Sequence, residues 1–474
     1  MDEDRWEPED DPATRGQVAA GTTMGCFYIE SPAMRLLQEK AGRGDFEHLV
    51  IHSSIIRPAA NEYIQKYLER LHGGAWDPIH PLVSDVLEET FGIMVYQEDV
   101  SRVAVALAGF SAAEADGLRK ILSKKDRVHA LRDFHARFRE GALARGVSEG
   151  RIEAIWQMIL SFDGYSFCKP HSASYARVSF QAAYLKTHFP AEFMAAVISN
   201  RGGFYAAFAY VSEARRLGLT VLPPDVNRSG VRWTGEGKML RVGLLSVKGL
   251  SEGTQSRIVK ERKLRPFDSM EDFLFRAKPR EDEARQLVRC GALDTFGPGG
   301  SRAQLTWMLA RRRAALGRKT GGSSLFGDVF GAMEIPAPVL PPDDETARLR
   351  SEFSVLGFLC DRHPMTLFSD AAKRSGSIPA KDIRKCVGRV VRIAGWLITG
   401  KKVRTKRGDT MEFLTFEDET GLVETTFFPD TYERFCHLLD WGRPYLLSGK
   451  VEENWGAVTL TVDGVAPFGR GAIT

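Results

Sequence analysis

The spacing of apolar residues changes along this chain from a helical period to a strand pattern. Over residues 21–215, apolar side chains recur at spacings of three and four, which is typical of amphipathic helices. From about residue 386 to residue 470, short runs rich in β-branched and aromatic residues alternate with turn signals such as Arg407–Gly408–Asp409. Both patterns within 474 residues predict a multidomain α+β protein of three or four domains, at roughly 100–200 residues each.

The last block has the element order of an OB-fold. Five strands are expected in the segments 390–397, 411–417, 423–428, 445–451 and 457–465. A helical stretch, 431–439, separates the third strand from the fourth. Three strands, a helix and two strands predict a C-terminal OB-fold β-barrel over residues 386–470.

The middle of the chain predicts smaller units and a linker. Residues 216–300 read as a short strand and two helical units that turn at Gly249 and Gly291. Residues 301–345 hold a segment rich in Gly, Pro and Arg, which predicts a linker. Residues 346–385 predict a connector with a helix, and the polar, acidic residues 1–20 predict a loosely ordered lead-in.

Composition excludes several classes of protein. The net charge of +4 does not by itself indicate nucleic-acid binding. None of the six cysteines has CxxC spacing, which argues against a zinc ribbon and fits a reducing cytoplasm. The apolar run 103–110 is far short of the roughly 20 residues that span a bilayer. The acidic start of the chain does not resemble a signal peptide, so we expect a cytoplasmic protein with no membrane partner.

Several short sequence blocks follow one another along the chain: 25–31 (GCFYIES), 56–58 (IRP), 90–98 (TFGIMVYQE), 108–111 (AGFS), 114–116 (EAD), 118–120 (LRK), 124–125 (KK), 165–175 (YSFCKPHSASY), 183–186 (AYLK) and 222–227 (LPPDVN). In this order they resemble the blocks of bacterial C-family DNA polymerases, the family of the DNA polymerase III alpha subunit and its error-prone relatives. The resemblance covers about residues 10–470 and implies polymerase fingers over 21–215 and a helix-hairpin-helix DNA-binding region over 216–300.

The chain departs from the family in one respect. Intact members begin with a PHP domain and a palm, whose paired aspartates hold two metal ions, and this sequence resembles only the domains that come after the palm. Asp2–Glu3–Asp4 has D-x-D spacing but lies in a polar terminus, so we interpret it as a solvated tail. We therefore expect no catalytic residues and no metal ligands in this chain, and Mg²⁺ only in the complete enzyme.

The family resemblance implies a dNTP-binding site of two residue sets. The first set is cationic, suits a triphosphate and lies after a capping-box start at Ser111 and Glu114. A solvated basic face is the alternative. The second set combines a lysine, a histidine and hydroxyls near an aromatic turn, with Tyr96, Gln97 and Glu98 as possible support; a structural role is its alternative. The dNTP-binding residues are Arg119, Lys120, Lys124, Lys125, Lys169, His171, Ser174 and Tyr175.

Two candidate hairpins predict contacts with duplex DNA. Residues 247–251 fit the first hairpin, although Ser251 replaces its second glycine, and residues 290–294 fit the second. Hairpin N–H groups at a helix N-terminus face a phosphate in such motifs. The expected duplex-binding residues are Lys248, Gly249, Lys260, Arg262 and Gly291, with a helical packing hairpin as the alternative.

Two further segments predict partners. Leu325 and Phe326 resemble the anchors of a sliding-clamp-binding peptide, or are linker residues. A basic hairpin between the first two barrel strands predicts single-strand binding through Lys401, Lys402, Arg404, Lys406 and Arg407. Trp396, Phe413, Phe416 and Phe427 interleave with it, and some of these aromatics must be core.

The expected function is DNA-directed DNA synthesis, in replication or translesion repair, with primer-template DNA, single-stranded DNA, dNTP and a sliding clamp as partners. A separate chain would supply the PHP domain and the palm. The alternatives are a non-catalytic DNA- or clamp-binding accessory and a fragment. The chain stops soon after the expected barrel, which resembles the error-prone branch, and a truncated replicative member is the alternative.

Overall fold

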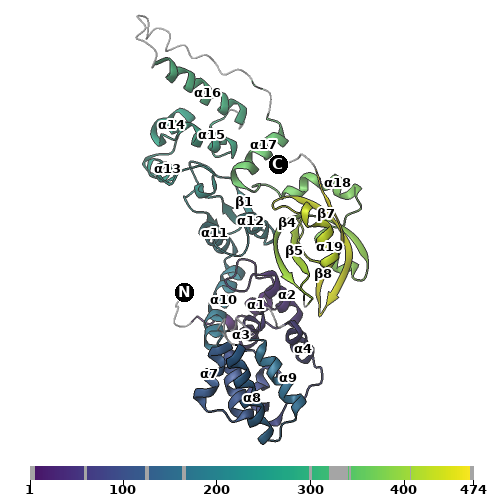
Figure 1. The fold of residues 1–474 in the computed structure, drawn as a ribbon. Helices are drawn as coiled ribbons and strands as arrows, with labels where there is room; N and C mark the ends of the chain where they lie inside the picture. The colour runs from purple at the N-terminus through teal and green to yellow at the C-terminus, as the bar shows by residue number, and fades with distance from the viewer. Residues whose placement is uncertain are drawn as a thin grey trace, which may run out of the picture. The chain divides into compact units, whose positions relative to one another are not determined.

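The computed structural model describes residues 6–57, 61–122, 128–162, 167–297, 301–319, 340, 343–405 and 407–469. It contains two compact units (Figure 1). The first comprises the chain up to His188 together with Glu453–Ala457, and the second comprises Phe189–Glu452 and the residues from Val458 on. The expected multidomain α+β fold is confirmed, because the first unit is helical and the second contains a closed β-barrel.

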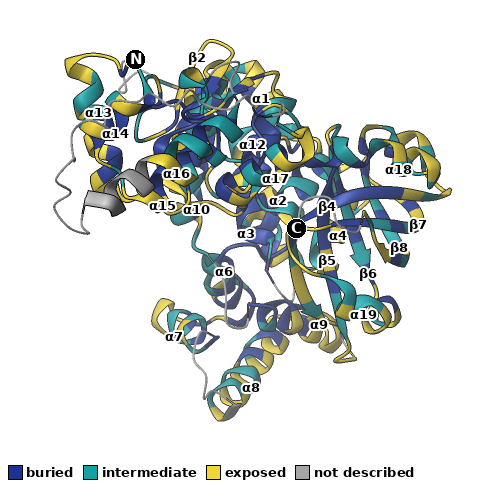
Figure 2. Cartoon of the chain, turned by 90° about the horizontal axis from the view of Figure 1, so that it is seen from above, coloured by how far each residue is buried: buried dark blue, intermediate teal, exposed yellow. Residues whose placement is uncertain are grey.

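Up to His188, the regular elements described in the first unit are all helices. The α-helices are α1 (Pro12–Ala19), α2 (Pro32–Ala41), α3 (Phe46–Ile55), α4 (Asn61–Leu71), α5 (Ser84–Leu87), α6 (Gln97–Ala108), α7 (Ala112–Leu122), α8 (Val128–Ala144), α9 (Glu149–Leu160) and α10 (Lys169–His188). Short 3₁₀ turns are η2 (Pro8–Asp10), η3 (Pro81–Val83) and η4 (Glu88–Thr90). Buried residues of α6 to α9, among them Val103, Leu118, Phe138 and Ile155, form one apolar core, and the opposite side of α8 is exposed (Figure 2).

The start of α7 confirms the capping box that the sequence predicts. The Ser111 backbone N–H donates to Glu114 Oε2 at 2.8 Å, and the Glu114 N–H donates to Ser111 Oγ at 3.3 Å. These reciprocal bonds satisfy N–H groups that the first helical turn leaves without a partner and so fix where α7 begins.

The second unit opens with helices and a small sheet. Its α-helices are α11 (Pro190–Asn200), α12 (Ala207–Arg216), α13 (Glu252–Leu264), α14 (Met270–Ala277), α15 (Glu281–Arg289), α16 (Arg302–Lys319), α17 (Glu345–Leu356), α18 (Ser369–Arg374) and α19 (Pro429–Phe435). Its 3₁₀ turns are η5 (Leu244–Ser246), η6 (Asp294–Phe296), η8 (Pro364–Phe368), η9 (Ala380–Cys386) and η10 (Cys436–Leu438). The sheet has the order β1 (Thr220–Leu222), β3 (Met239–Arg241), β2 (Thr234–Glu236). Of these strands the sequence predicts only the first.

The C-terminal barrel has the predicted OB order. Its strands are β4 (Val390–Arg404), β5 (Thr410–Glu417), β6 (Leu422–Phe427), β7 (Pro444–Asn454) and β8 (Ala457–Pro467), and they close in the order β4-β5-β6-β8-β7. Burial alternates along β6, which places Val423, Thr425 and Phe427 inside. The helix α19 lies between the third and fourth barrel strands, as expected.

A buried ion network fixes the barrel to the preceding connector within the second unit. Glu417 of β5 is fully buried, and its Oε1 lies 3.2 Å from His363 Nε2. Its Oε2 accepts a hydrogen bond of 3.1 Å from Arg216 of α12. Because a buried charge is costly without partners, this carboxylate ties α12 and the connector to the barrel wall.

Candidate nucleic-acid interface

Arg119 and Lys120 lie in the last turn of α7, and both bind Asp116. Arg119 Nη2 donates to Asp116 Oδ1 at 2.7 Å, and Lys120 Nζ lies 2.7 Å from Oδ2. The hydrogen bond from Lys120, and then the one from Arg119, lowers the pKa of Asp116. The side chain of Lys120 is 64% exposed, so an incoming anion reaches it in competition with Asp116. The predicted cations Lys124 and Lys125 lie outside the described residues.

Gln97 connects these cations to the start of α10. Its side-chain Oε1 accepts a hydrogen bond of 3.0 Å from Arg119, and its backbone N–H donates to the carbonyl oxygen of Phe167 at 3.1 Å. The structure therefore links Arg119 of the first predicted set to the segment that opens α10, where the second set lies. We call Arg119, Lys120, the carboxylates Asp116 and Glu89, and the first two turns of α10 the α7–α10 cluster.

Lys169 is the first residue of α10 and is held on two sides. Its Nζ lies 2.8 Å from Glu89 Oε1 and 5.5 Å from the centre of the Tyr96 ring. Its backbone N–H donates to Glu98 Oε2 at 3.3 Å. Tyr96 and Glu98 thus support Lys169, as Gln97 supports Arg119.

His171 is part of a cluster of aromatic side chains and contacts two of them directly. The imidazole stacks on Phe167, with ring centres 5.4 Å apart, and meets Tyr175 at 4.1 Å. Tyr175 also meets Phe27 at 5.2 Å and Tyr28 at 4.9 Å. Phe27 is 45% exposed, so this aromatic surface is open at one side and can stack on a planar base.

Two carboxylates of the cluster escaped sequence reasoning. The spacing of Asp116 from Arg119 and Lys120 on one helix was a usable signal, because residues three and four apart share a face. Glu89 lies 80 residues before Lys169, which leaves no local signal. Ser174 of the predicted set donates its hydroxyl to the Pro170 carbonyl oxygen at 2.9 Å, a bond internal to the helix.

The first predicted hairpin contains an internal carboxylate. Its chain turns at Gly249, with φ of +83°, and α13 begins after Ser251. The Ser251 N–H and Oγ donate to Glu283 at 2.9 and 2.6 Å, and Thr254 Oγ1 donates at 2.9 Å. Burial raises the pKa of Glu283, but hydrogen bonds from Ser251, Arg280 and Thr254 together lower it to about 2.

The second predicted hairpin is filled by an arginine. Gly291 has a φ of +83°, and the Arg302 guanidinium lies where a side chain on this glycine would project. Arg302 Nη2 lies 2.9 Å from Asp294 Oδ2, and Nη1 donates to the Arg289 carbonyl oxygen at 3.0 Å. Gly291 therefore faces a protein cation in this structure.

The remaining predicted duplex-binding residues differ in their surroundings. Lys248 and Lys260 are exposed. Arg262 Nη1 donates to the carbonyl oxygens of Val226 and Ser229 at 2.9 and 2.8 Å, and burial lowers its pKa. Arg262 thus fastens α13 to the segment that carries the LPPDVN block.

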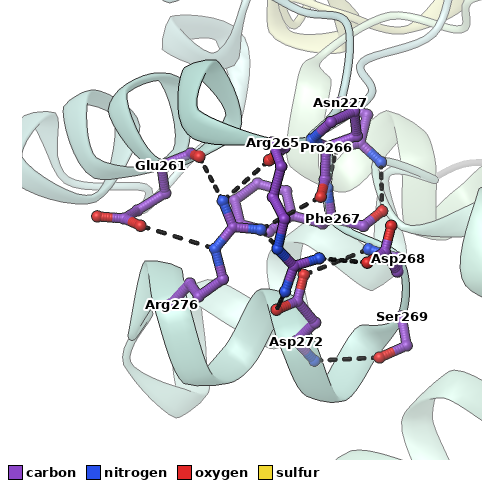
Figure 3. Close-up of polar contacts among 9 residues, drawn as sticks. All are labelled: Asn227, Glu261, Arg265, Pro266, Phe267, Asp268, Ser269, Asp272 and Arg276. Atoms are coloured by element: carbon purple, nitrogen blue, oxygen red, sulfur yellow. Dashed lines mark hydrogen bonds and ion pairs between the residues drawn. The ribbon is translucent and has the colours of Figure 1, made fainter.

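The same block fastens the loop between α13 and α14 (Figure 3). The Asn227 amide makes two 2.8 Å hydrogen bonds with the backbone of Phe267, one to its carbonyl oxygen and one from its N–H. Arg276 covers the Phe267 ring at 4.6 Å and donates to Pro266 and Asp272. The LPPDVN block therefore has an architectural role in the second unit.

The basic residues of the barrel lie on an extended hairpin. Lys401, Lys402 and Arg404 belong to β4 itself, which pairs with β5 as far as Arg404 opposite Thr410. They are exposed, as is Arg407 in the turn, while Lys406 lies outside the described residues. The sequence predicts a basic hairpin here, and the structure adds that its first strand begins inside the barrel wall.

Aromatic side chains accompany these cations, and Lys402 Nζ lies 5.5 Å from the centre of the Tyr432 ring. Phe413 is 43% exposed and pairs with Lys401 on one side and Thr426 on the other. Trp396, Phe416 and Phe427 are buried, as the strand alternation requires of some of them. The candidate clamp anchors Leu325 and Phe326 lie outside the described residues.

Three segments of the chain are similar to known domain families. Residues 6–146 match the model of the bacterial DNA polymerase III alpha subunit finger domain, 218–305 a helix-hairpin-helix motif, and 391–467 an OB-fold nucleic acid binding domain. A DNA polymerase III subunit alpha from Thermus aquaticus is 35% identical, over 96% of this chain and 38% of its own length. The chain belongs to the bacterial DNA polymerase III alpha-subunit family.

Other relatives in the DNA polymerase III alpha family carry two kinds of name. An error-prone DNA polymerase from Symbiobacterium thermophilum is 31% identical, over 96% of this chain and 46% of its own length. A DNA polymerase III subunit alpha from Aquifex aeolicus is 32% identical, over 94% of this chain and 38% of its own length. The chain thus spans less than half the length of these relatives, and their names leave the replicative and error-prone branches both open.

The described part of this alpha-family chain offers no evident metal centre. Among the residues that the structure describes, no group of three or more His, Cys, Asp or Glu side chains could hold a metal ion. Glu89 and Asp116 in the α7–α10 cluster each bind a lysine or arginine instead. No helix among the same residues is long and apolar enough to cross a membrane.

Proposed function

We propose that this chain is the nucleotide- and DNA-binding part of a bacterial DNA polymerase of the DNA polymerase III alpha type, acting in the cytoplasm in replication or translesion repair synthesis. The proposal rests on the order of three domains along one chain: finger, helix-hairpin-helix and OB. A relative named as a DNA polymerase III alpha subunit aligns with this chain over almost all of its length.

The α7–α10 cluster would bind the triphosphate of the incoming dNTP. Arg119 offers a planar fork for phosphate oxygens, and Lys120 and Lys169 offer point charges. All three are held by carboxylates, and a triphosphate would replace Asp116 and Glu89 as their partner. The open aromatic surface around His171 suits the base or the primer end.

The second unit would hold the nucleic acid. Its helix-hairpin-helix region suits the backbone of duplex primer-template DNA, and its barrel suits the single-stranded template beside it. A sliding clamp would bind the segment around Leu325 and Phe326, and a separate chain would supply the PHP domain and the palm. Mg²⁺ would be held by that separate chain in the complete enzyme.

Nucleotide binding distinguishes this function from that of a DNA- or clamp-binding accessory. With primer-template DNA present, we expect a dNTP complementary to the template to bind the full chain. The double variant Arg119→Ala, Lys120→Ala should weaken this binding at least tenfold, because it removes two phosphate partners. The matched control Lys66→Ala removes a first-unit cation that pairs with Glu62 and should change little.

Fluorescence titration with a labelled dNTP makes this measurement. An accessory protein would bind the DNA without any dNTP, so saturating DNA with no nucleotide binding would reject the polymerase function. An equal loss in the double variant and the Lys66→Ala control would reject the proposed site.

A further inference from the structure

A groove of about 970 Å³ lies beside the first hairpin, entirely within the second unit. Its walls are the end of α11, the turn before β2, the hairpin with the start of α13, and the end of α17. The Lys248 backbone N–H donates to the Val355 carbonyl oxygen at 3.3 Å, which fixes the hairpin to the α17 wall.

The charged residues that line this groove are mostly cationic. Arg201, Arg232 and Lys248 line it and are exposed, and Glu252 is its one acidic residue among those described. Arg201 ends α11 in a left-handed conformation, with φ of +51°, and its guanidinium donates to the Leu245 carbonyl oxygen before the hairpin. Three cations from three separate segments thus converge on one groove, together with serine hydroxyls such as Ser246 and Ser256.

The hairpins themselves have already used donors that a phosphate would need. The Ser251 N–H, at the start of α13, is bound by the buried carboxylate of Glu283. In the second hairpin, the space beside Gly291 holds the guanidinium of Arg302. An anion approaching this region therefore meets side-chain cations at the groove, while the Ser251 N–H already donates to Glu283.

We propose that this groove binds the sugar-phosphate backbone of double-stranded DNA, with Arg201, Arg232 and Lys248 as the phosphate partners and Glu252 as a repulsive neighbour. The inference rests on the proposed function, which it deepens by naming the contact. It moves the contact from the backbone of the hairpins to side chains of three segments. Such contacts position a duplex without reading its sequence.

The experiment measures the affinity of the full chain for a blunt DNA duplex by fluorescence anisotropy, at several salt concentrations. We expect the double variant Arg201→Ala, Arg232→Ala to lower the slope of log K against log salt by about 1.8, or roughly 0.9 per phosphate contact, with at least a tenfold loss of affinity at low salt. The variant Arg201→Lys, Arg232→Lys should retain most of the affinity. Glu252→Gln should strengthen binding, an effect that loss of folding cannot mimic.

The charge-matched control is the double variant Lys373→Ala, Arg374→Ala, on exposed residues of α18 that do not line the groove. If the control loses as much affinity as the groove variant, or if Glu252→Gln weakens binding, the groove is not the contact. Loss on single-stranded DNA alone would also overturn the inference. If the unmodified chain binds no DNA at low salt, the proposed function itself fails.

Discussion

In the absence of a ligand, the carboxylate of Asp116 neutralises part of the positive charge of Arg119 and Lys120. It accepts hydrogen bonds from both Arg119 and Lys120, and its side chain is 42% exposed. Exposed ion pairs contribute little to stability, so under the proposed function a triphosphate would displace this carboxylate without unfolding α7.

Replacing Asp116 by Asn tests this competition. The variant keeps the size of the side chain and removes its charge, so Arg119 and Lys120 become more available. We expect the affinity for dNTP in the presence of primer-template DNA to rise several-fold, as measured by titration with a labelled nucleotide. Glu62→Gln, which neutralises a carboxylate paired with Lys66, is the control; an unchanged affinity in Asp116→Asn would argue against competition.

The lowered pKa of Glu283 predicts that the folded chain loses stability in acid. Its pKa falls from an ordinary value of 4.5 to about 2 in the folded chain. A lowered carboxyl pKa stabilises the fold above pH 4.5, and this contribution disappears as the pH falls towards 2. The shift corresponds to about 3 kcal/mol at neutral pH.

Urea unfolding of the Glu283→Gln variant at pH 7, 4 and 3 measures this contribution. We expect the free energy of unfolding to be lower than that of the unmodified chain by about 3 kcal/mol at pH 7, with the difference shrinking as the pH falls. A difference independent of pH would mean that the carboxylate charge is not what holds the first hairpin.

Among the secondary-structure elements, the strands of the barrel could be predicted from the sequence, but the contacts inside the two hairpins could not. Turn signals and β-branched runs gave five strands and the helix between the third and fourth. The extent of β4 escaped, because pairing of Arg404 with Thr410 continues beyond the barrel wall through polar residues. Strands β2 and β3 have three residues each, too few for a period-2 pattern.

For the candidate sites too, residue types could be predicted from the sequence but the contacts between distant residues could not. Residue types and family blocks singled out Arg119 and Lys169 as candidates, but the link from Arg119 through Gln97 to Phe167 depends on how α6, α7 and the start of α10 pack together. Ser251 and Glu283 are 32 residues apart, and no local pattern reports their contact. Contacts of this kind come from tertiary packing, which a single sequence does not display.

A substitution at Phe413 tests whether the barrel binds single-stranded DNA. It lies exposed beside Lys401, where a base can stack on the ring and the cation can reach the phosphate. We expect Phe413→Ala to weaken binding of single-stranded DNA by about 1–3 kcal/mol in fluorescence anisotropy. Val390→Ala, at the opposite end of β4 and 68% exposed, should have no effect; equal losses would mean a general change in the barrel.

For the whole molecule, the proposed function predicts that this chain binds DNA and nucleotide without extending a primer by itself. The described residues include no group of three or more potential metal ligands, and phosphoryl transfer by two metal ions requires carboxylates to hold them. We expect no primer extension by this chain alone with Mg²⁺ and dNTPs on a sequencing gel. Extension by the purified chain that disappears in Arg119→Ala would contradict this.

The proposed function as a whole depends on electrostatic binding of primer-template DNA by cations spread over both units. The most direct test is the affinity of the full chain for a primer-template duplex, measured between about 50 and 200 mM salt. We expect tight binding at low salt and a linear fall of log K with log salt, with a slope of about −3 or steeper. No binding at low salt, or binding that is indifferent to salt, would contradict it.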